Sequence, residues 1–260
     1  MSDDDRYKAR IYLHRGNLGQ ARHYYERALH DDRQSNDVQN LTDTLGNLGN
    51  VCALIGDHPQ AEMYYREVLS LQREQRDPSA IGQTLVNLGN VQTDAGWTEK
   101  ARAYYLEALD YLAPIADHRA LGILYSNLAL QDAAAGRVEE AITRFTQALE
   151  SHRIVGDEQG LAVTYSQLGK TFLQAGRLPQ AEKCLNNASE HFVKLGQPDS
   201  EAAVLRHLAE LYVQDASYLN AIRCLERVLL LDTRCGLPDT EQDTARLARV
   251  RDLWQAQARL

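Results

Sequence analysis

Carboxamide side chains recur along this sequence at intervals of forty residues. The first series is Asn47, Asn87, Asn127 and Gln167, and the second, three residues later, is Asn50 and Asn90. Asparagine is a mediocre helix-interior residue because its side chain competes for backbone hydrogen bonds, so its repeated use needs an explanation. A row of amides can both donate to and accept from the backbone of an extended ligand. The two series therefore predict a peptide-binding surface rather than a catalytic site.

A structural role is the alternative for the same amides. Asn47, Asn87 and Asn127 could instead bond to the end of a neighbouring helix and hold the spacing between repeats, and the sequence leaves both roles open. Asn50 and Asn90 are expected to point further outward, which favours ligand binding.

The residues that most often carry catalysis form no catalytic pattern here. The 8 histidines belong to no H-E-x-x-H motif and no Cys/His cluster, and the 4 cysteines include no C-x-x-C pair. The sequence also lacks a G-x-S-x-G motif, a phosphate-binding glycine-rich loop and a dinucleotide fingerprint. We therefore expect a non-enzymatic protein that uses no cofactor and no metal.

Composition excludes several classes of partner. Hydrophobic residues make up 44% of the chain and charged residues 25%, which is typical of a folded protein. The formal net charge of −8 argues against a nucleic-acid partner. Residues 1–6 do not resemble a secretory signal, and no apolar run approaches the ~20 residues that a membrane span needs. We expect a cytoplasmic protein with reduced cysteines that binds neither nucleic acid nor membrane.

The amides are positioned by a repeat with a period of forty residues. A turn column reads Gly16, Gly56, Gly96, Gly136, Gly176 and Ala216. Five residues later stand Ala21, Ala61, Ala101, Ala141, Ala181 and Ala221, and four after these Tyr25, Tyr65, Tyr105, Phe145, Leu185 and Leu225. Seven residues before the turn column lie Ala9, Gly49, Gly89, Ala129, Gly169 and Ala209. Six repeats follow one another without insertion or deletion.

Each column has a physical role in a helical hairpin. A glycine such as Gly56 can adopt the left-handed conformation that ends a helix, and Asp57 can cap the next one. Small residues let two antiparallel helices approach closely, and the aromatic side chain fills the space between repeats. We call the first helix of each hairpin helix A and the second helix B. Polar linkers at 35–37, 76–78, 116–117, 156–157 and 196–199 separate the hairpins.

This pattern closely resembles the tetratricopeptide repeat in a 40-residue form. The resemblance implies an all-α fold: a right-handed superhelix (α-solenoid) of six helix-turn-helix repeats over residues 1–238, followed by a capping helix over 239–260. The repeats are most similar to the Asn-Leu-Gly repeats of Gα-binding cell-polarity adaptors and to arrays in bacterial regulatory proteins. In the last segment the period places Ala248 and Arg249 opposite Leu208 and Ala209.

The resemblance also implies where a ligand lies. In this family the A helices line a concave groove that holds a peptide or a helix of a partner protein, so the chain is expected to be an interaction scaffold or adaptor. The expected peptide-binding residues are Asn47, Asn50, Asn87, Asn90, Asn127, Gln167, Lys170, Arg206 and His207. The last three would favour an acidic side chain in the ligand. The carboxylate clamp of co-chaperone repeats is not expected, because its basic positions hold Gly46, Ile123 and Asn127.

Two other functions stay open on the sequence. The tyrosine pairs 24–25, 64–65 and 104–105 could form a surface for self-association, although packing between repeats explains them more simply. The chain could also be a sensory or regulatory array that controls an effector domain on another chain.

Overall fold

The computed structural model describes residues 2–35, 37–236 and 239–258, and within these ranges every regular element is an α-helix. The predicted all-α fold is thereby confirmed. The linker residue Asn36 and the predicted boundary residues 238 and 260 lie outside the described ranges. The chain forms two compact units, Met1–Asn127 and Leu128–Leu260, and the division falls within helix α7.

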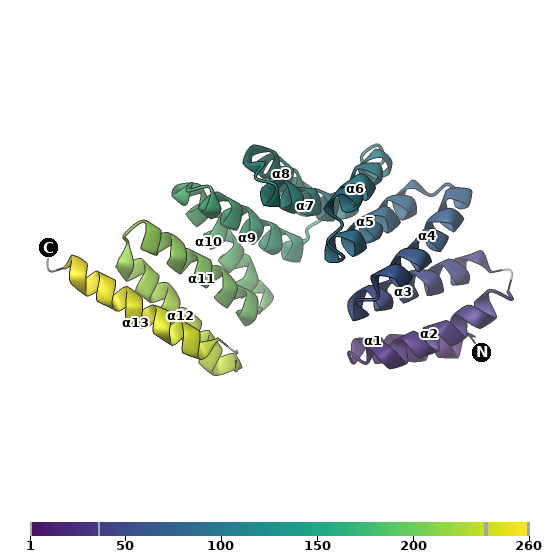
Figure 1. Ribbon diagram of the computed structural model, residues 1–260, viewed down its shortest axis with the longest axis horizontal. Helices are drawn as coiled ribbons and strands as arrows, with labels where there is room; N and C mark the ends of the chain where they lie inside the picture. Colours follow the sequence, from purple (N-terminus) through teal and green to yellow (C-terminus); the bar gives the residue numbers. More distant parts are fainter. Residues whose placement is uncertain (1, 36, 237–238, 259–260) are drawn as a thin grey trace. The chain divides into compact units, whose positions relative to one another are not determined.

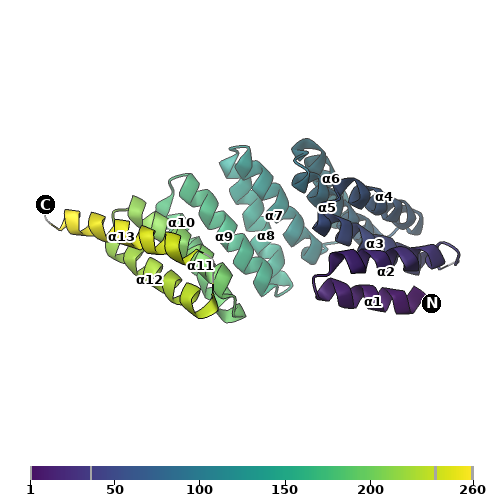
Figure 2. The same cartoon turned by 60° about the horizontal axis from the view of Figure 1, so that its bottom comes forward.

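The first unit is a stack of helical hairpins (Figures 1 and 2). Its helices are α1 (Ser2–His14), α2 (Leu18–Asp32), α3 (Val38–Ile55), α4 (His58–Gln75), α5 (Pro78–Asp94), α6 (Thr98–Leu112) and the first part of α7 (His118–Ala134). From α1 to α6, each helix packs against the next along the chain. Helices α1, α3, α5 and α7 occupy helix A positions, so the amides stand on A helices as predicted.

The second unit repeats the same arrangement. Its helices are the remainder of α7, α8 (Val138–Ile154), α9 (Glu158–Gln174), α10 (Leu178–Leu195), α11 (Pro198–Gln214), α12 (Tyr218–Cys235) and α13 (Thr240–Gln257). From α8 onward, each helix packs against its successor, and α13 lies against α12 (Figure 1).

The turn inside each hairpin follows from two residues. In the second repeat Gly56 has a φ of 86°, and the amide of the next residue, Asp57, donates to the Cys52 carbonyl at 2.9 Å. The Asp57 side chain then accepts from the amide of Gln60 at the start of α4. A left-handed residue thus closes α3 and a carboxylate begins α4, as predicted. In the last repeat Ala216 adopts the same conformation with a φ of 54°.

The small residues of helix A leave space for an aromatic ring of helix B. A Cβ atom placed on Gly49 would lie 2.8 Å from the ring of Tyr65, and one on Gly89 would lie 2.2 Å from the ring of Tyr105. Both distances are too short for a real contact, so only glycine lets these rings lie against helix A. The rings are almost completely buried, which makes each a central part of its hairpin's core.

The junctions between repeats are chemically different from one another. In the first unit Thr44 donates a buried 2.7 Å hydrogen bond to Asp32, and Thr84 donates one of 2.8 Å to Gln72. In the second unit one of the corresponding pairs is Phe192 and Val204, which belong to one hydrophobic cluster. These three junctions are therefore internally matched, two polar with polar and one apolar with apolar.

No helix in the part of the chain that the structure describes is long and apolar enough to cross a membrane.

Candidate peptide-binding surfaces

Asn50 is bonded to the tyrosine of its own hairpin. The Tyr65 hydroxyl donates to the side-chain oxygen of Asn50 at 2.6 Å. Gly49 leaves room for the Tyr65 ring, and the adjacent residue, Asn50, accepts the hydrogen bond of its hydroxyl. This matters because a buried hydroxyl needs a hydrogen-bond partner. Burial also raises the pKa of Tyr65, which keeps its hydroxyl protonated and able to donate. Asn50 retains its NH₂ group for a ligand.

Asn90 is more heavily used. Its side-chain oxygen accepts from the Tyr105 hydroxyl at 2.7 Å and from the Asn127 amide at 2.7 Å. Burial raises the pKa of Tyr105 to about 12, so it too stays a donor. Asn127 lies one repeat further along, on α7, and its bond to Asn90 links two neighbouring A helices within the first unit. This geometry supports a spacing role for Asn127.

The sequence itself contained a signal for these hydrogen bonds. Asn50 and Asn90 stand where the ring of the hairpin is tyrosine, whereas the fourth repeat has Leu130 at the same position and the hydroxyl-free ring of Phe145. The first repeat breaks the rule: it carries Arg10, and the Tyr25 hydroxyl has no hydrogen-bond partner in the described chain. An amide and a phenol thus occur as a pair in two repeats.

Asn47 and Asn87 make the fewest side-chain hydrogen bonds to other helices among the amides of the first unit. Asn47 donates to the backbone oxygen of Asp43 in its own helix at 2.8 Å, which leaves its side-chain oxygen free. Asn87 makes no side-chain hydrogen bond with any described residue and is half-buried. Both, together with Asn50, line a depression of about 300 Å³ on α3, α4 and α5. Asn47 offers a free acceptor to this depression, Asn50 offers the two donors of its NH₂ group, and Asn87 offers a complete amide.

In the second unit the predicted residues lie on α9 and α11. Gln167 is half-buried and Lys170 is exposed. Burial lowers the pKa of His207 below 6.5, the nearby Lys170 ammonium lowers it further, and the Glu210 carboxylate opposes both. The His207 Nδ1 atom lies 4.0 Å from a Glu210 oxygen. His207 is therefore mainly uncharged at neutral pH.

Arg206 is occupied by its own chain. Its Nε donates to Asp243 on α13 at 2.8 Å, and one Nη donates to Asp232 on α12 at 3.3 Å. The side chains of both aspartates are fully buried, and that of Arg206 is only 18% exposed. Arg206 therefore fastens α11 to α12 and α13, a role that the sequence analysis did not foresee.

The register of α13 differs from the one predicted. Leu247 and Val250 are the buried apolar residues of this helix, each 6% exposed, whereas Ala248 and Arg249 are exposed. Leu247 thus takes the place of Leu208, and the spacing at this step is 39 residues instead of 40. The expected alignment of Arg249 with Ala209 was wrong, because α13 buries Leu247 and Val250 and leaves Arg249 exposed.

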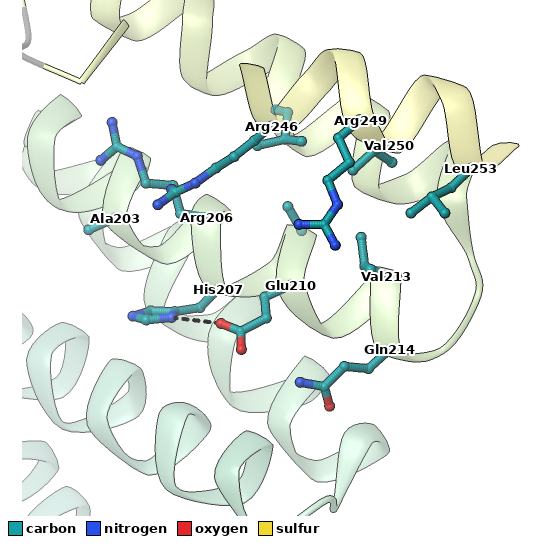
Figure 3. A pocket seen from close by; sticks show the side chains of 12 residues that line it. Ala203, Arg206, His207, Glu210, Val213, Gln214, Arg246, Arg249, Val250 and Leu253 are labelled. Carbon is teal, nitrogen blue, oxygen red and sulfur yellow. Dashed lines mark ion pairs between the residues drawn. The ribbon is translucent and has the colours of Figure 1, made fainter. Parts of the chain in front are cut away.

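The corrected register adds two residues to the candidate surface. Arg246 and Arg249 now correspond to His207 and Glu210, the positions that carry amides in the second repeat. The sequence does contain this signal, since Arg246-Leu247-Ala248-Arg249 parallels His207-Leu208-Ala209-Glu210 once a one-residue deletion is allowed. Both arginines line a pocket of about 600 Å³ between α11 and α13 (Figure 3).

The tyrosine pairs pack within the molecule. Tyr64 is buried, and Tyr104 accepts a hydrogen bond from Arg66 at 3.2 Å. Tyr24 stacks on Tyr12 with a centroid distance of 5.4 Å. These contacts support the packing role considered above.

Antiparallel helix pairs stacked in sequence, with polar side chains repeating on the A helices, define a helical repeat protein of the α-solenoid class. The chain belongs to the tetratricopeptide repeat family. The sequence model of that family, described as "Tetratricopeptide repeat", matches residues 5–74, 40–113, 80–154, 120–192 and 160–234. This repeat is in general a non-catalytic interaction module, and the chain's class as an interaction scaffold follows from it. No curated protein matches the sequence.

Solved structures share this fold. BtubC (BKLC) from P. vanneervenii is 22% identical with a TM-score of 0.73, over 85% of this chain and 90% of its own. A putative kinesin light chain with nearly identical TPR-like repeats from Podosopora anserina is 16% identical with a TM-score of 0.61, over 75% of this chain and 95% of its own. The Rap conjugation gene regulator of plasmid pLS20, in complex with the Phr* peptide, is 15% identical with a TM-score of 0.67, over 98% of this chain and 74% of its own.

Proposed function

We propose that this protein is a non-enzymatic scaffold of the cytoplasm that holds a peptide or helix of a partner protein against its A helices. In the first unit the contacts come from Asn47, Asn50, Asn87, Asn90 and Asn127. In the second they come from Gln167, Lys170 and His207, and Arg206 supports them by holding α13 in place. All four cysteines are free thiols, which suits a reducing compartment.

The depression shared by Asn47, Asn50 and Asn87 is the observation that carries the proposal. Its free donors and acceptors match the alternating N–H and C=O groups of an extended backbone. Asn87 contributes most, because its whole amide is unused and half-buried. A half-buried amide without a partner contributes little to folding and is available to a ligand.

The internal bonds rank the remaining residues. Asn90 and Asn127 bind a ligand only through the groups that their mutual bond leaves over. Arg206 contributes through the position of α13 and not by direct pairing, since two buried aspartates already accept from it. Lys170 forms no such bond with the described residues and His207 has only the 4.0 Å contact with Glu210, so both contact the ligand directly.

The test compares two pairs of amide substitutions. Asn47→Ala with Asn87→Ala should reduce the amount of partner recovered from native lysate several-fold, as counted by mass spectrometry. Gln147→Ala with Asn220→Ala is the matched control, since it removes two exposed amides from the B helices α8 and α12. Both variants should unfold within about 0.5 kcal/mol of the parent. Normal partner recovery with a clearly lower melting temperature in the first variant would show that its amides are architectural.

A regulatory array is the second candidate. The Rap regulator in complex with the Phr* peptide shows that a chain with this fold can be a regulator and bind a peptide. If our chain acts in this way, its recovered partner is an effector protein whose binding changes when a short peptide is added. Self-assembly is the third candidate, and sedimentation as a monomer at every concentration measured would argue against it.

A further inference from the structure

The pocket between α11 and α13 combines an apolar floor with a guanidinium that has no partner among the described residues. Val213 of α11 and Val250 and Leu253 of α13 supply apolar surface, and Arg249 reaches from α13 toward α11 above it (Figure 3). Throughout the described residues, Arg249 makes no hydrogen bond and no ion pair, and its side chain is exposed. The pocket volume of about 600 Å³ lies within the range of ligand-binding cavities.

Arg249 forms no ion pair with the acidic residues around it in the described chain, including Glu210, which also lines the pocket. The Asp243 carboxylate is held by Arg206 at 2.8 Å and by Arg246 at 3.1 Å. Glu210 faces His207 at 4.0 Å, and no carboxylate in the described chain lies within ion-pair distance of Arg249. A local positive charge thus stands above an apolar floor in a protein whose net charge is −8.

The position of Arg249 separates it from an ordinary solvated arginine. It is one residue after the small residue Ala248, in the place that Asn50 and Asn90 hold on earlier A helices. Arg251, by comparison, pairs with Glu226 of α12 at 2.7 Å. Arg251 is thus paired with the preceding helix, whereas Arg249 has no such partner among the described residues and lines the pocket.

We propose that this pocket takes an acidic side chain, Asp or Glu, of the bound peptide together with a neighbouring aliphatic side chain. Arg249 pairs with the carboxylate, because its planar fork of donors matches two carboxylate oxygens. Gln214, at the edge of the pocket, provides a further donor, and the aliphatic group rests on Val213, Val250 and Leu253. This inference rests on the proposed function, because it names part of the peptide ligand. The residues that support it lie on α11 and α13 and do not include the amides.

The probes are fluorescent hexapeptides with an acetylated N-terminus and an amidated C-terminus. Each contains one Glu and one Leu, and the remaining positions are alanine. The set covers every possible separation between the Glu and the Leu. A second set replaces Glu by Gln. We expect the best Glu peptide to bind the full-length protein about tenfold more tightly than its Gln counterpart by fluorescence anisotropy, the size of effect typical of a charge-assisted hydrogen bond.

Three variants localise the effect. Arg249→Gln should abolish the preference for Glu over Gln, and Arg249→Glu should replace it by a preference for a Lys peptide. Arg251→Gln, which removes the same charge from the same helix, should keep the preference. Circular dichroism checks the fold, and little change is expected because Arg249 is exposed and unbonded.

Several results would overturn the inference. One is that no Glu peptide binds more tightly than its Gln counterpart, and another is that the preference survives in Arg249→Gln. A third is that a Gln peptide with a free C-terminal carboxylate binds about tenfold more tightly than the same peptide with an amidated C-terminus. The pocket would then recognise a chain end and not an acidic side chain. If Arg249→Gln leaves the preference intact while the Asn47/Asn87 variant loses its partner, only this inference fails and the proposed function stands.

Discussion

The Tyr65 hydroxyl and the Asn50 amide form a 2.6 Å hydrogen bond that joins the two helices of one hairpin. The bond exists because Gly49, the residue before Asn50, leaves room for the tyrosine ring. Three residues thus form one structural group, and part of the amide series serves the fold before it serves a ligand.

This relationship predicts a coupled pair of substitutions. Asn50→Leu alone should lower the stability by about 1–2 kcal/mol, because it leaves the Tyr65 hydroxyl without its partner. Combining it with Tyr65→Phe should recover most of the loss, since the fourth repeat already uses Leu130 with Phe145. Denaturant titration of the four members of the cycle gives the coupling energy. Additive effects would contradict the structural group.

Arg206 should be necessary for the attachment of α13. Replacing Arg206 by Gln removes the cation from two buried carboxylates, and a broken buried ion pair typically costs about 3–5 kcal/mol. Hydrogen exchange of the α13 amides should rise strongly, while exchange in the first unit stays unchanged. Arg234→Gln, an exposed arginine near the end of α12, is the control. Unchanged protection of α13 in Arg206→Gln would show that its apolar contacts suffice.

Ala216 should gain stability on substitution by glycine. Its φ of 54° is unfavourable for a residue with a Cβ atom, and five other repeats have glycine there. Ala216→Gly should raise the stability of the second unit by about 1 kcal/mol. Ala175→Gly is the matched control, because Ala175 ends α9 with a φ of −82° and should gain nothing. Equal effects in thermal unfolding would argue against the conformational explanation.

His207 should make both stability and ligand binding depend on pH. Its pKa is lowered in the folded state, so its contribution to stability is fully present above pH 6.5 and is lost as the pH falls through the lowered pKa. Protonation adds a positive charge to the pocket beside Arg249, so an acidic peptide should bind more tightly at that lower pH. NMR titration of His207 gives its pKa, and His207→Gln should abolish the shared pH dependence. A pKa at or above 6.5 would contradict the direction.

The period of the sequence was sufficient to predict the helices, the turns and the close-packed columns. It succeeded because the left-handed turn at Gly56 recurs in every repeat, and because each position equivalent to Gly49 holds a small residue, glycine or alanine. The roles of the amides were harder to predict, because whether Asn50 is free depends on the presence of a hydroxyl fifteen residues away. The surface formed by Arg246 and Arg249 was missed for a different reason: a single deletion changes which side of α13 faces inward, and a strict period of forty cannot show it.

The matched junctions have a consequence for folding. Six similar repeats could in principle dock in the wrong order, as neighbours of equal shape compete for the same helix. Asp32 is satisfied by Thr44 and Gln72 by Thr84, whereas Phe192 rests against apolar neighbours such as Val204. Exchanging these partners would leave a carboxylate against an aliphatic chain or a hydroxyl against a phenyl ring, each at a cost of about 1–3 kcal/mol. The buried residues between repeats thus disfavour docking of a polar junction surface against the apolar one of Phe192 and Val204.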